Sequence, residues 1–410
     1  MMENIVGPAV YGGNYLESRK YLVDNLRKRL CRASVLIDAP RRFGKTSVIK
    51  EFQRQEQEKE RDAFNVLFFD LEGLASVDEF CNKCLEELLK LCKFKNMLTK
   101  LKEFSNALIN GILDSIESIE TPFFSTNLRE RTRNMKPEEL KKVLESFIKC
   151  LNDLDRKTVL IFDEFPDMLL NIKSNAQSHE DYVKTVNNLT AWLRDLRQSS
   201  SGQNKYRFVF CGSINLRKTL DSIGLSKRIN DLESLKVPPL TEKEAEMLIN
   251  ALTQTENIMI APEGLAFLVS KLKDGSPYYG QFMVQVLSER KERENIISNF
   301  TRAQVEDAYD EMIHSHSNNL SHFYSRLDDY YPDPLQKDHA KKALKILCNG
   351  ALDEQQLHTV HFSSAIDADE FHKIVERLID EGYILEDATD AGKLRFASSV
   401  LRDWWSVGRF

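Results

Sequence analysis

One short segment, APRRFGKT at residues 39–46, has residue types and a spacing that suit phosphate binding. A small residue, four variable residues, glycine, lysine and a hydroxyl residue bind phosphate when a strand precedes them and a helix follows. Gly44 lets the backbone turn its N–H groups towards an anion, Lys45 supplies a mobile ammonium group, and the Thr46 hydroxyl can ligate Mg²⁺. We therefore expect a nucleotide at a phosphate loop formed by Ala39, Pro40, Arg41, Arg42, Phe43, Gly44, Lys45, Thr46 and Ser47.

A second segment, KTVLIFDEFPDML at residues 157–169, places two carboxylates after an apolar run. The pattern predicts a buried strand that presents Asp163 and Glu164 at its carboxyl end. Asp163 would hold Mg²⁺, directly or through water, and Glu164 would orient and deprotonate the attacking water. An acidic turn after a core strand is the alternative, and the phosphate loop upstream favours the catalytic interpretation.

Two further segments contain residues that could sense the nucleotide. The strand predicted from Tyr206 to Leu216 ends in small polar residues, of which Ser213 or Asn215 could contact the γ-phosphate or position the water. A plain strand-to-helix turn explains these two residues equally well. Arg228 is a candidate arginine finger for the nucleotide of a neighbouring subunit, with a solvated basic loop as its alternative. The candidate catalytic residues are thus Glu164, Lys45 and Arg228.

The elements around these residues alternate between buried strands and amphipathic helices. The run SVLI precedes the phosphate loop, an apolar-periodic helix follows it, and NVLFFDLEG at 65–73 forms the next buried strand. This alternation is typical of a parallel sheet with helical connections. A long helical region at 77–119 includes Cys81 and Cys84, and a buried helix face is favoured there over a metal or redox pair because no second ligand pair completes a site. The segment 121–137 is expected to be an exposed connection, and Pro137 to open another helix.

Composition limits the class of protein. The 410 residues are 42% hydrophobic and 29% charged, which suits two or three globular domains. No apolar run approaches the roughly 20 residues that span a membrane, and the N-terminus lacks the features of a signal peptide. The seven scattered cysteines suit reduced thiols, so we expect a cytoplasmic protein. The net charge of −6 provides no general basic footprint for nucleic acid.

The pattern changes after residue 240. A capping box of Thr241 and Glu244 opens a helical domain, expected at 240–330, in which the motif DGSPYYGQF separates two helices. Asp328 to Pro334 is expected to be a linker. Three helices and a hairpin at 335–410 predict a winged helix. Ten Lys and Arg against thirteen Asp and Glu give this part a charge of −3, which disfavours DNA as its partner and favours a protein-contact or autoinhibitory role.

Together these segments resemble the archaeal-type ATPases of the STAND branch of the AAA-like P-loop NTPases. The resemblance rests on VLIDAPRRFGKTSVI, VLIFDEFPDML, FVFCGSINL, NDLESLKVPPLTEKEA, DGSPYYGQF and RFASSVLRDWW, in the family's order. It implies an α/β P-loop NTPase core with a parallel sheet at 1–239, a helical lid domain and a C-terminal winged-helix domain. It also implies ATP and Mg²⁺ as cofactors, with Lys45, Thr46, Asp163 and Glu164 in the roles given above. Two features depart from the family pattern: Ala39 replaces the first glycine, and no Gly-Arg-Glu precedes the first helix.

The leading hypothesis is an ATP-hydrolysing switch, slow or partner-stimulated, that controls self-assembly or a separate effector protein in signalling or prokaryotic defence. One alternative is a DNA-associated ATPase that regulates recombination or transposition. The other is a nucleotide-dependent scaffold with negligible turnover. A homo-oligomer, an effector protein or both are the expected partners, and no membrane is expected.

Overall fold

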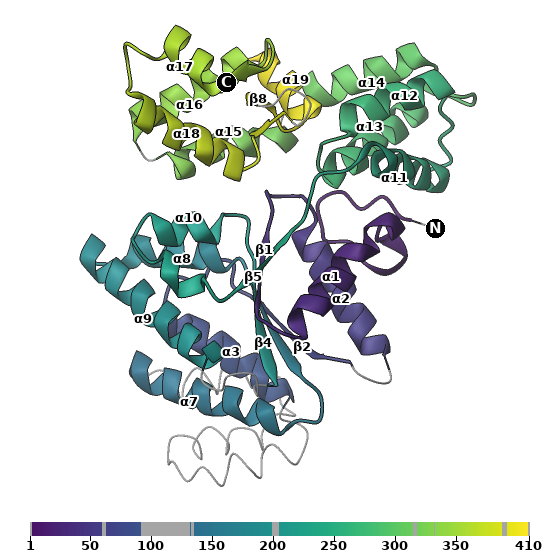
Figure 1. Ribbon diagram of the computed structural model, residues 1–410. Helices are drawn as coiled ribbons and strands as arrows, with labels where there is room; N and C mark the ends of the chain where they lie inside the picture. The colour runs from purple at the N-terminus through teal and green to yellow at the C-terminus, as the bar shows by residue number, and fades with distance from the viewer. Residues whose placement is uncertain are drawn as a thin grey trace. The chain divides into compact units, whose positions relative to one another are not determined.

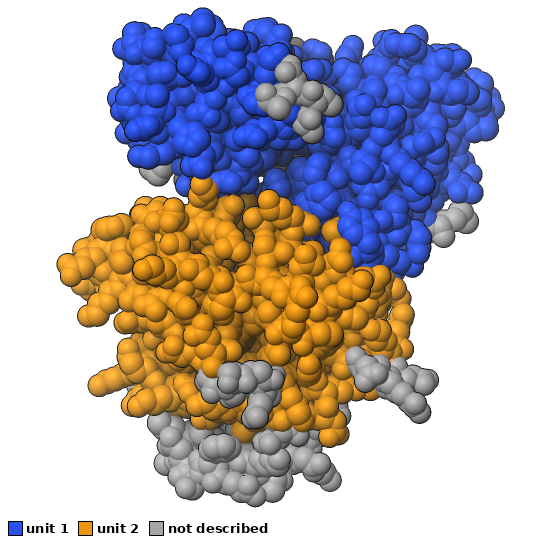
Figure 2. Space-filling model, in the orientation of Figure 1, with its two compact units in different colours: residues 1–21, 39–48, 237–410 blue, residues 22–38, 49–236 orange. Residues whose placement is uncertain are grey.

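The computed structural model describes residues 2–59, 63–91, 132, 135–198, 205–314, 318–331, 333–387 and 392–408. The chain forms two compact units, shown in different colours in Figure 2. One of them, unit 2 in Figure 2, is called the sheet unit here and comprises Leu22–Asp38 and Ile49–Lys236. The other, unit 1, is called the helical unit and comprises Met1–Tyr21, Ala39–Val48 and Val237–Phe410. The sequence predicted three domains with boundaries near residues 240 and 335. The division into two compact units does not test those boundaries, so they remain a prediction.

The sheet unit contains a five-stranded sheet in the order β2-β3-β4-β1-β5, in which every described pair of neighbours is parallel. Its strands are β1 (Val35–Asp38), β2 (Asn65–Asp70), β3 (Thr158–Asp163), β4 (Tyr206–Phe210) and β5 (Glu233–Lys236). The strand β3 is buried throughout, because it lies inside the sheet and is covered on both faces. The strand β2 lies at an edge and is only partly buried, which is less than its apolar sequence suggested. Consecutive strands β1 and β2 are not neighbours, since β4 and β3 lie between them.

Helices cover both faces of this sheet (Figure 1). Figure 1 shows α1 (Lys20–Leu30) and α2 (Lys45–Glu58) on one face. The other face carries α3 (Val77–Leu91), α7 (Pro137–Cys150), α8 (Phe165–Asn175), α9 (His179–Gln198) and α10 (Leu216–Asp221). Pro137 stands in the first turn of α7, as predicted, where its missing N–H has no intrahelical partner to lose. The arrangement is the α/β fold of P-loop NTPases.

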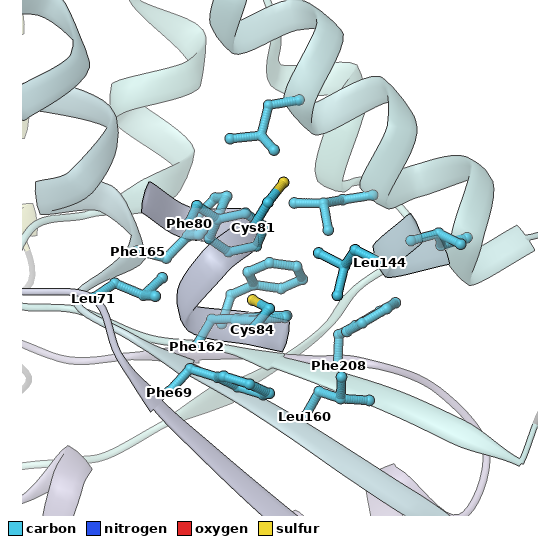
Figure 3. Close-up of a cluster of buried hydrophobic side chains, with 14 of the residues drawn as sticks. Phe69, Leu71, Phe80, Cys81, Cys84, Leu144, Leu160, Phe162, Phe165 and Phe208 are labelled. Carbon is cyan, nitrogen blue, oxygen red and sulfur yellow. The ribbon is translucent and has the colours of Figure 1, made fainter. Parts of the chain in front are cut away.

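A cluster of aromatic side chains joins the sheet to the second of these helical layers (Figure 3). The Phe162 ring on β3 lies 5.1 Å from that of Phe69 and 5.4 Å from those of Phe80 and Phe210. Such offset ring contacts add to the free energy gained from burying the apolar area itself. The carboxyl end of β3 is therefore firmly placed by its apolar neighbours.

Cys81 and Cys84 lie on α3 among these apolar side chains, which confirms the prediction of a buried helix face (Figure 3). Burial raises the pKa of the Cys81 thiol to about 12, and it raises that of Cys84 well above its ordinary value. No group of three or more potential ligands that could hold a metal ion occurs among the described residues. Cys92 and nearly all of the predicted helix and connection at 92–134 lie outside the described residues.

The helical unit contains the predicted set of helices after β5. These are α11 (Glu242–Thr255), α12 (Pro262–Leu272), α13 (Pro277–Glu294), α14 (Arg302–His314) and α15 (Asn318–Tyr330). The predicted capping box is present, because Thr241 Oγ1 accepts from the N–H of Glu244 at 3.2 Å and the Glu244 carboxylate accepts from the Thr241 N–H at 2.9 Å. Ser276 caps α13, and Pro277 stands in its first turn. None of the helices described is long and apolar enough to cross a membrane.

The C-terminal residues form the predicted winged helix within the helical unit. It consists of α16 (Pro334–Leu347), α17 (Glu354–His361), α18 (Ala368–Asp380), α19 (Ser399–Val407) and the antiparallel strands β6 (Leu352–Asp353), β7 (Ile384–Glu386) and β8 (Lys393–Phe396), in the order β6-β8-β7. The linker expected from Asp328 to Pro334 is shorter than predicted, since α15 runs to Tyr330 and α16 begins at Pro334. The buried Tyr330 ring packs against Tyr383, so tertiary packing keeps the end of α15 helical.

Candidate functional site

The phosphate loop connects β1, which ends at Asp38, to α2, which begins at Lys45. Its backbone adopts the left-handed region at two residues, Arg42 (φ 66°) and Gly44 (φ 92°). The glycine has no Cβ and takes this conformation without strain, whereas the arginine does so only because its surroundings hold it. The loop thus enters the N-terminus of α2, where the N–H groups of the first turn have no intrahelical acceptor and favour an anion.

Lys45 is buried, with 6% of its surface exposed. Its ammonium group donates hydrogen bonds to the carbonyl oxygens of Ala39 at 2.6 Å and Pro40 at 3.0 Å. These contacts hold the ammonium group against the carbonyl oxygens of its own loop. The Ser47 hydroxyl, in the first turn of α2, accepts a hydrogen bond from the N–H of Val10 at 3.1 Å.

Two segments from the C-terminal half of the helical unit also contact the phosphate loop. At the start of α13, the Ser276 hydroxyl donates to the carbonyl oxygen of Arg42, and the Arg42 guanidinium lies 3.9 Å from the centre of the Tyr278 ring. After α18, Gly382 (φ 76°) lies so close to Pro40 that a Cβ added there would be 2.4 Å from the proline ring. The loop is therefore enclosed by residues more than two hundred positions away in the sequence.

The second part of the candidate site lies in the sheet unit, where β3 ends. We call it the acidic corner and define it as Asp163, Glu164, Asp167, Gly212 and Ser213. Asp163 is buried, with 6% of its surface exposed. Its carboxylate accepts from the Cys211 thiol at 3.2 Å and from the Glu164 N–H at 3.2 Å. The Cys211 thiol and the Glu164 N–H therefore orient the Asp163 carboxylate.

Glu164 turns the chain from β3 into α8. It has a left-handed backbone (φ 54°) and occupies the position before the first residue of the helix. The turn is hydrogen-bonded to the residue that follows β4, since the Phe165 N–H donates to the Cys211 carbonyl at 3.1 Å. Non-glycine residues in this conformation are uncommon and concentrate at functional sites. The left-handed backbone therefore fixes the direction in which the Glu164 side chain leaves the chain.

The Glu164 side chain is held by Ser213 from the end of β4. Its Oε2 accepts from the Ser213 N–H at 2.7 Å and from the Ser213 hydroxyl at 3.0 Å. The same hydroxyl lies 3.4 Å from both carboxylate oxygens of Asp167 on α8. Gly212 makes this approach possible, because a Cβ there would be 2.5 Å from Pro166 Cδ and 3.3 Å from Glu164 Oε2.

Arg228 lies apart from the acidic corner, in the short helix η4 (Ser226–Ile229). Its guanidinium donates to Asn187 Oδ1 on α9 at 2.7 and 3.0 Å, and its carbonyl accepts from Arg197. Asn215 caps α10 by accepting from the Lys218 N–H, so its side chain serves the turn after β4. Of the two polar residues considered there, Ser213 is the one that contacts the predicted base.

Apart from Arg228 and Asn215, the predicted residues thus fall into two groups. Residues 39–47 form one continuous loop in the helical unit, and Asp163, Glu164 and Ser213 meet in the sheet unit. The sequence patterns do not single out Asp167, Ser276 or Tyr278, and they include Gly212 only among the small polar residues at the strand end. The glycine before Ser213 and the third carboxylate within FDEFPD are visible signals for Gly212 and Asp167, whereas no local pattern links residues 276 and 278 to position 42.

The donor set of these groups suits a hard cation and a phosphate. Thr46 supplies a hydroxyl and Asp163 a carboxylate, and oxygen ligands of this kind are those that Mg²⁺ prefers. The left-handed Gly44 and the buried Lys45 provide the open backbone and the positive charge that phosphates require. The residues present therefore fit Mg²⁺ and a nucleotide.

Comparison with known proteins bears on the fold. No family model and no curated protein matches the chain. Among solved structures, a Walker-type ATPase of Pyrococcus abyssi is similar over 98% of this chain and 99% of its own, at 14% identity with a TM-score of 0.64. The ORC2 protein of Aeropyrum pernix, in its ADPNP–ADP complexes, is similar over 99% and 94%, at 12% identity with a TM-score of 0.55. At these identities the similarity establishes the class of fold, that of the P-loop NTPases with a lid and a winged helix.

Proposed function

We propose that the chain binds ATP with Mg²⁺ and hydrolyses it, and that the nucleotide sets the state of the lid and winged helix. The observation that carries the proposal is the geometry of the acidic corner, where a left-handed Glu164 is held through Oε2 by the N–H and hydroxyl of Ser213. A turn that served only to connect a strand to a helix would not need a strained glutamate with two donors. The phosphate loop and the acidic corner follow strands β1 and β3 of one parallel sheet, whose carboxyl ends share an edge.

In this proposal the phosphate loop binds the nucleotide. The backbone N–H groups at the start of α2 and the ammonium group of Lys45 neutralise the phosphates. Thr46 and Asp163 hold Mg²⁺, which when bound draws charge from the phosphate oxygens. The nucleotide named for the Aeropyrum pernix protein, ADPNP or ADP, is of the class that this loop would take.

Glu164 acts as the general base. Its carboxylate takes a proton from water as the oxygen attacks the terminal phosphorus, and the ADP oxygen leaves. Ser213 orients that carboxylate through its hydroxyl and would exchange this bond for one to phosphate when the nucleotide binds. Arg228 is then a finger for a neighbouring subunit's nucleotide, after release from Asn187. The STAND-type switch, its effector and its place in signalling or defence belong to the same proposal, as does a cytoplasmic location.

Two substitutions test the proposal. Lys45→Ala should abolish binding of a fluorescent ATP analogue, because the phosphates lose their principal cation. Glu164→Gln should retain binding and lower the turnover number about 100- to 10,000-fold, the range for loss of a general base. Glu180→Gln, an exposed glutamate on α9, is the control and should leave both quantities unchanged. Unchanged turnover in Glu164→Gln would refute the assignment of the base, and unchanged binding in Lys45→Ala would refute the site.

The acidic face of the winged helix favours a protein as the partner over DNA. Near its start, α18 presents Asp367, Asp369 and Glu370, which line an open hollow together with Lys373. Phosphates would be repelled from such a face. ATPase rates measured at rising protein concentration and, separately, with duplex DNA distinguish the two partners. Stimulation by concentration alone supports self-assembly, whereas stimulation by DNA that falls steeply with salt supports the DNA-associated alternative.

A further inference from the structure

The first turn of α13 makes two contacts with one residue of the phosphate loop. The Ser276 hydroxyl donates to the main-chain carbonyl of Arg42, while the Tyr278 ring lies under the Arg42 guanidinium at 3.9 Å. Both residues of α13 are buried, with 1% and 5% of their surfaces exposed. Backbone and side chain of Arg42 are therefore bound to the same helical turn.

Arg42 is also the residue of the loop whose conformation needs outside support. Its φ of 66° lies in the left-handed region, which side chains with a Cβ rarely adopt. Such residues persist where surrounding contacts over-determine them. The hydroxyl of Ser276 and the ring of Tyr278 are contacts of this kind, because each acts on a different part of Arg42.

These contacts extend to the peptide that follows. The carbonyl of Arg42 and the N–H of Phe43 belong to one planar unit, so fixing one fixes the other. The Phe43 N–H points back across the loop to the Pro40 carbonyl at 3.4 Å, while Ser276 holds the carbonyl on the opposite side. The peptide is thus held at both polar atoms, and it leads directly into Gly44 and the N–H groups of the first turn of α2.

We propose that Ser276 and Tyr278 are positioning residues that preset the phosphate loop by holding Arg42 in its left-handed conformation. This inference rests on the proposed binding of ATP at that loop. A loop held in its binding conformation avoids the loss of conformational freedom that binding would otherwise impose. Loss of this clamp, meaning the contacts of Ser276 and Tyr278 with Arg42, lowers the fraction of molecules with a competent loop. The apparent affinity for ATP falls by that fraction. The base and its partner Ser213 are untouched, so KM rises while kcat is retained.

The chain offers a matched control for Ser276. Ser276 and Ser398 both cap a helix of the helical unit, α13 and α19, and both are buried, at 1% and 3% exposure. Replacement by alanine removes a cap in either case, with a similar expected loss of stability. Only Ser276 donates a hydrogen bond to the phosphate loop. For the ring, Tyr278→Phe keeps the aromatic face and Tyr278→Leu removes it.

The experiment measures the dissociation constant for Mg-ATP by calorimetry, together with tryptic cleavage after Arg41 and Arg42 in the nucleotide-free protein. We expect Ser276→Ala to weaken binding about tenfold, the loss of one hydrogen bond, and Tyr278→Leu to weaken it several-fold. Ser276→Thr and Tyr278→Phe should restore most of the affinity, and Ser398→Ala should leave it unchanged. Cleavage should accelerate in Ser276→Ala and Tyr278→Leu alone.

Two results would overturn the inference while leaving the proposed function intact. One is an equal change in affinity for Mg-ATP in Ser276→Ala and Ser398→Ala, because loss of a helix cap would then explain the weaker binding. The other is wild-type cleavage and affinity in Ser276→Ala. A wild-type protein that binds no ATP, like Lys45→Ala, would instead refute the proposed function and the role of Ser276 and Tyr278 in binding. The cleavage comparison uses no nucleotide, so it separates failure of the proposed function from failure of the inference about Arg42.

Discussion

The phosphate loop and the acidic corner are held in place by different means. The acidic corner is fixed by near neighbours: Asp163, Glu164 and Ser213 sit on the ends of adjacent strands β3 and β4, above a core of packed aromatic rings. The phosphate loop is fixed by a serine, a tyrosine and a glycine from α13 and the turn after α18. An apolar core thus stabilises one part of the candidate site, and distant polar and turn contacts stabilise the other. This difference leads to four predictions.

The largest effect concerns the thiols in the core below the acidic corner. Burial raises the pKa of Cys81 to about 12, so its reactive thiolate at about pH 8 is on the order of a thousandfold scarcer than for an ordinary cysteine. Iodoacetamide should therefore modify the exposed Cys31 in the native protein and reach Cys81 and Cys84 only on unfolding. Mass spectrometry of the labelled cysteines checks this. Native labelling of Cys81 as fast as Cys31 would show that the core opens readily.

The next effect tests the close approach that forms the acidic corner. Gly212→Ala places a Cβ against the Pro166 ring, and overpacking of this kind costs about 1–3 kcal/mol. Hydrogen exchange of β3 and β4 should report that loss as local destabilisation. Adding Pro166→Ala removes the Cδ and Cγ atoms in conflict and should recover stability. A double variant as unstable as the single one would mean that Gly212 is needed for another reason.

The third effect adds backbone strain to an overlap of the same kind, where the winged helix approaches the phosphate loop. Gly382→Ala combines a left-handed backbone with an overlap on Pro40, whereas Gly73→Ala has nearly the same φ, 77°, and open space around its Cβ. Backbone strain alone costs roughly 1–2 kcal/mol, and the overlap should add to it at residue 382 only. Hydrogen exchange of α18 and of the loop measures the difference. Equal losses in the two variants would show that the proline contact is soft enough to yield.

The smallest effect is a pH dependence in the helical unit. His372 on α18 hydrogen-bonds to Glu354 on α17 at 2.9 Å, and this bond raises the pKa of the histidine. The pair therefore stabilises the fold fully below the ordinary histidine pKa of about 6.5, and the contribution is lost as pH rises through the raised value. Solvent exposure keeps it small. His372→Gln should flatten the pH dependence of unfolding, Glu354→Gln should do the same, and the double variant should add little.

The sequence predicted best what neighbouring residues decide. The phosphate loop, the cap at Thr241, the burial of β3 and the succession of helices after β5 follow from local patterns, and the structure contains them. It predicted less well what distant residues decide. Tyr330 stays helical because Tyr383 covers it, and β1 pairs with β4 and β5 rather than with β2.

The same division holds within the candidate site. Asp163 and Glu164 were visible as carboxylates after an apolar run, but the left-handed backbone of Glu164 depends on β4, which lies some forty residues further on. The clamp on Arg42 was invisible for the same reason. Periodicity reports one element at a time, and both features arise only when separate elements pack together.

The contact between Gly382 and Pro40 also has a consequence for synthesis of the chain. Asp163, Glu164, Cys211 and Ser213 have all left the ribosome soon after residue 213, so the hydrogen bonds among them can form while translation continues. Pro40 must wait for residue 382, a delay of roughly 20 to 70 s at ordinary elongation rates. A nascent chain would thus complete the contacts among its carboxylates early and the contact between Gly382 and Pro40 last.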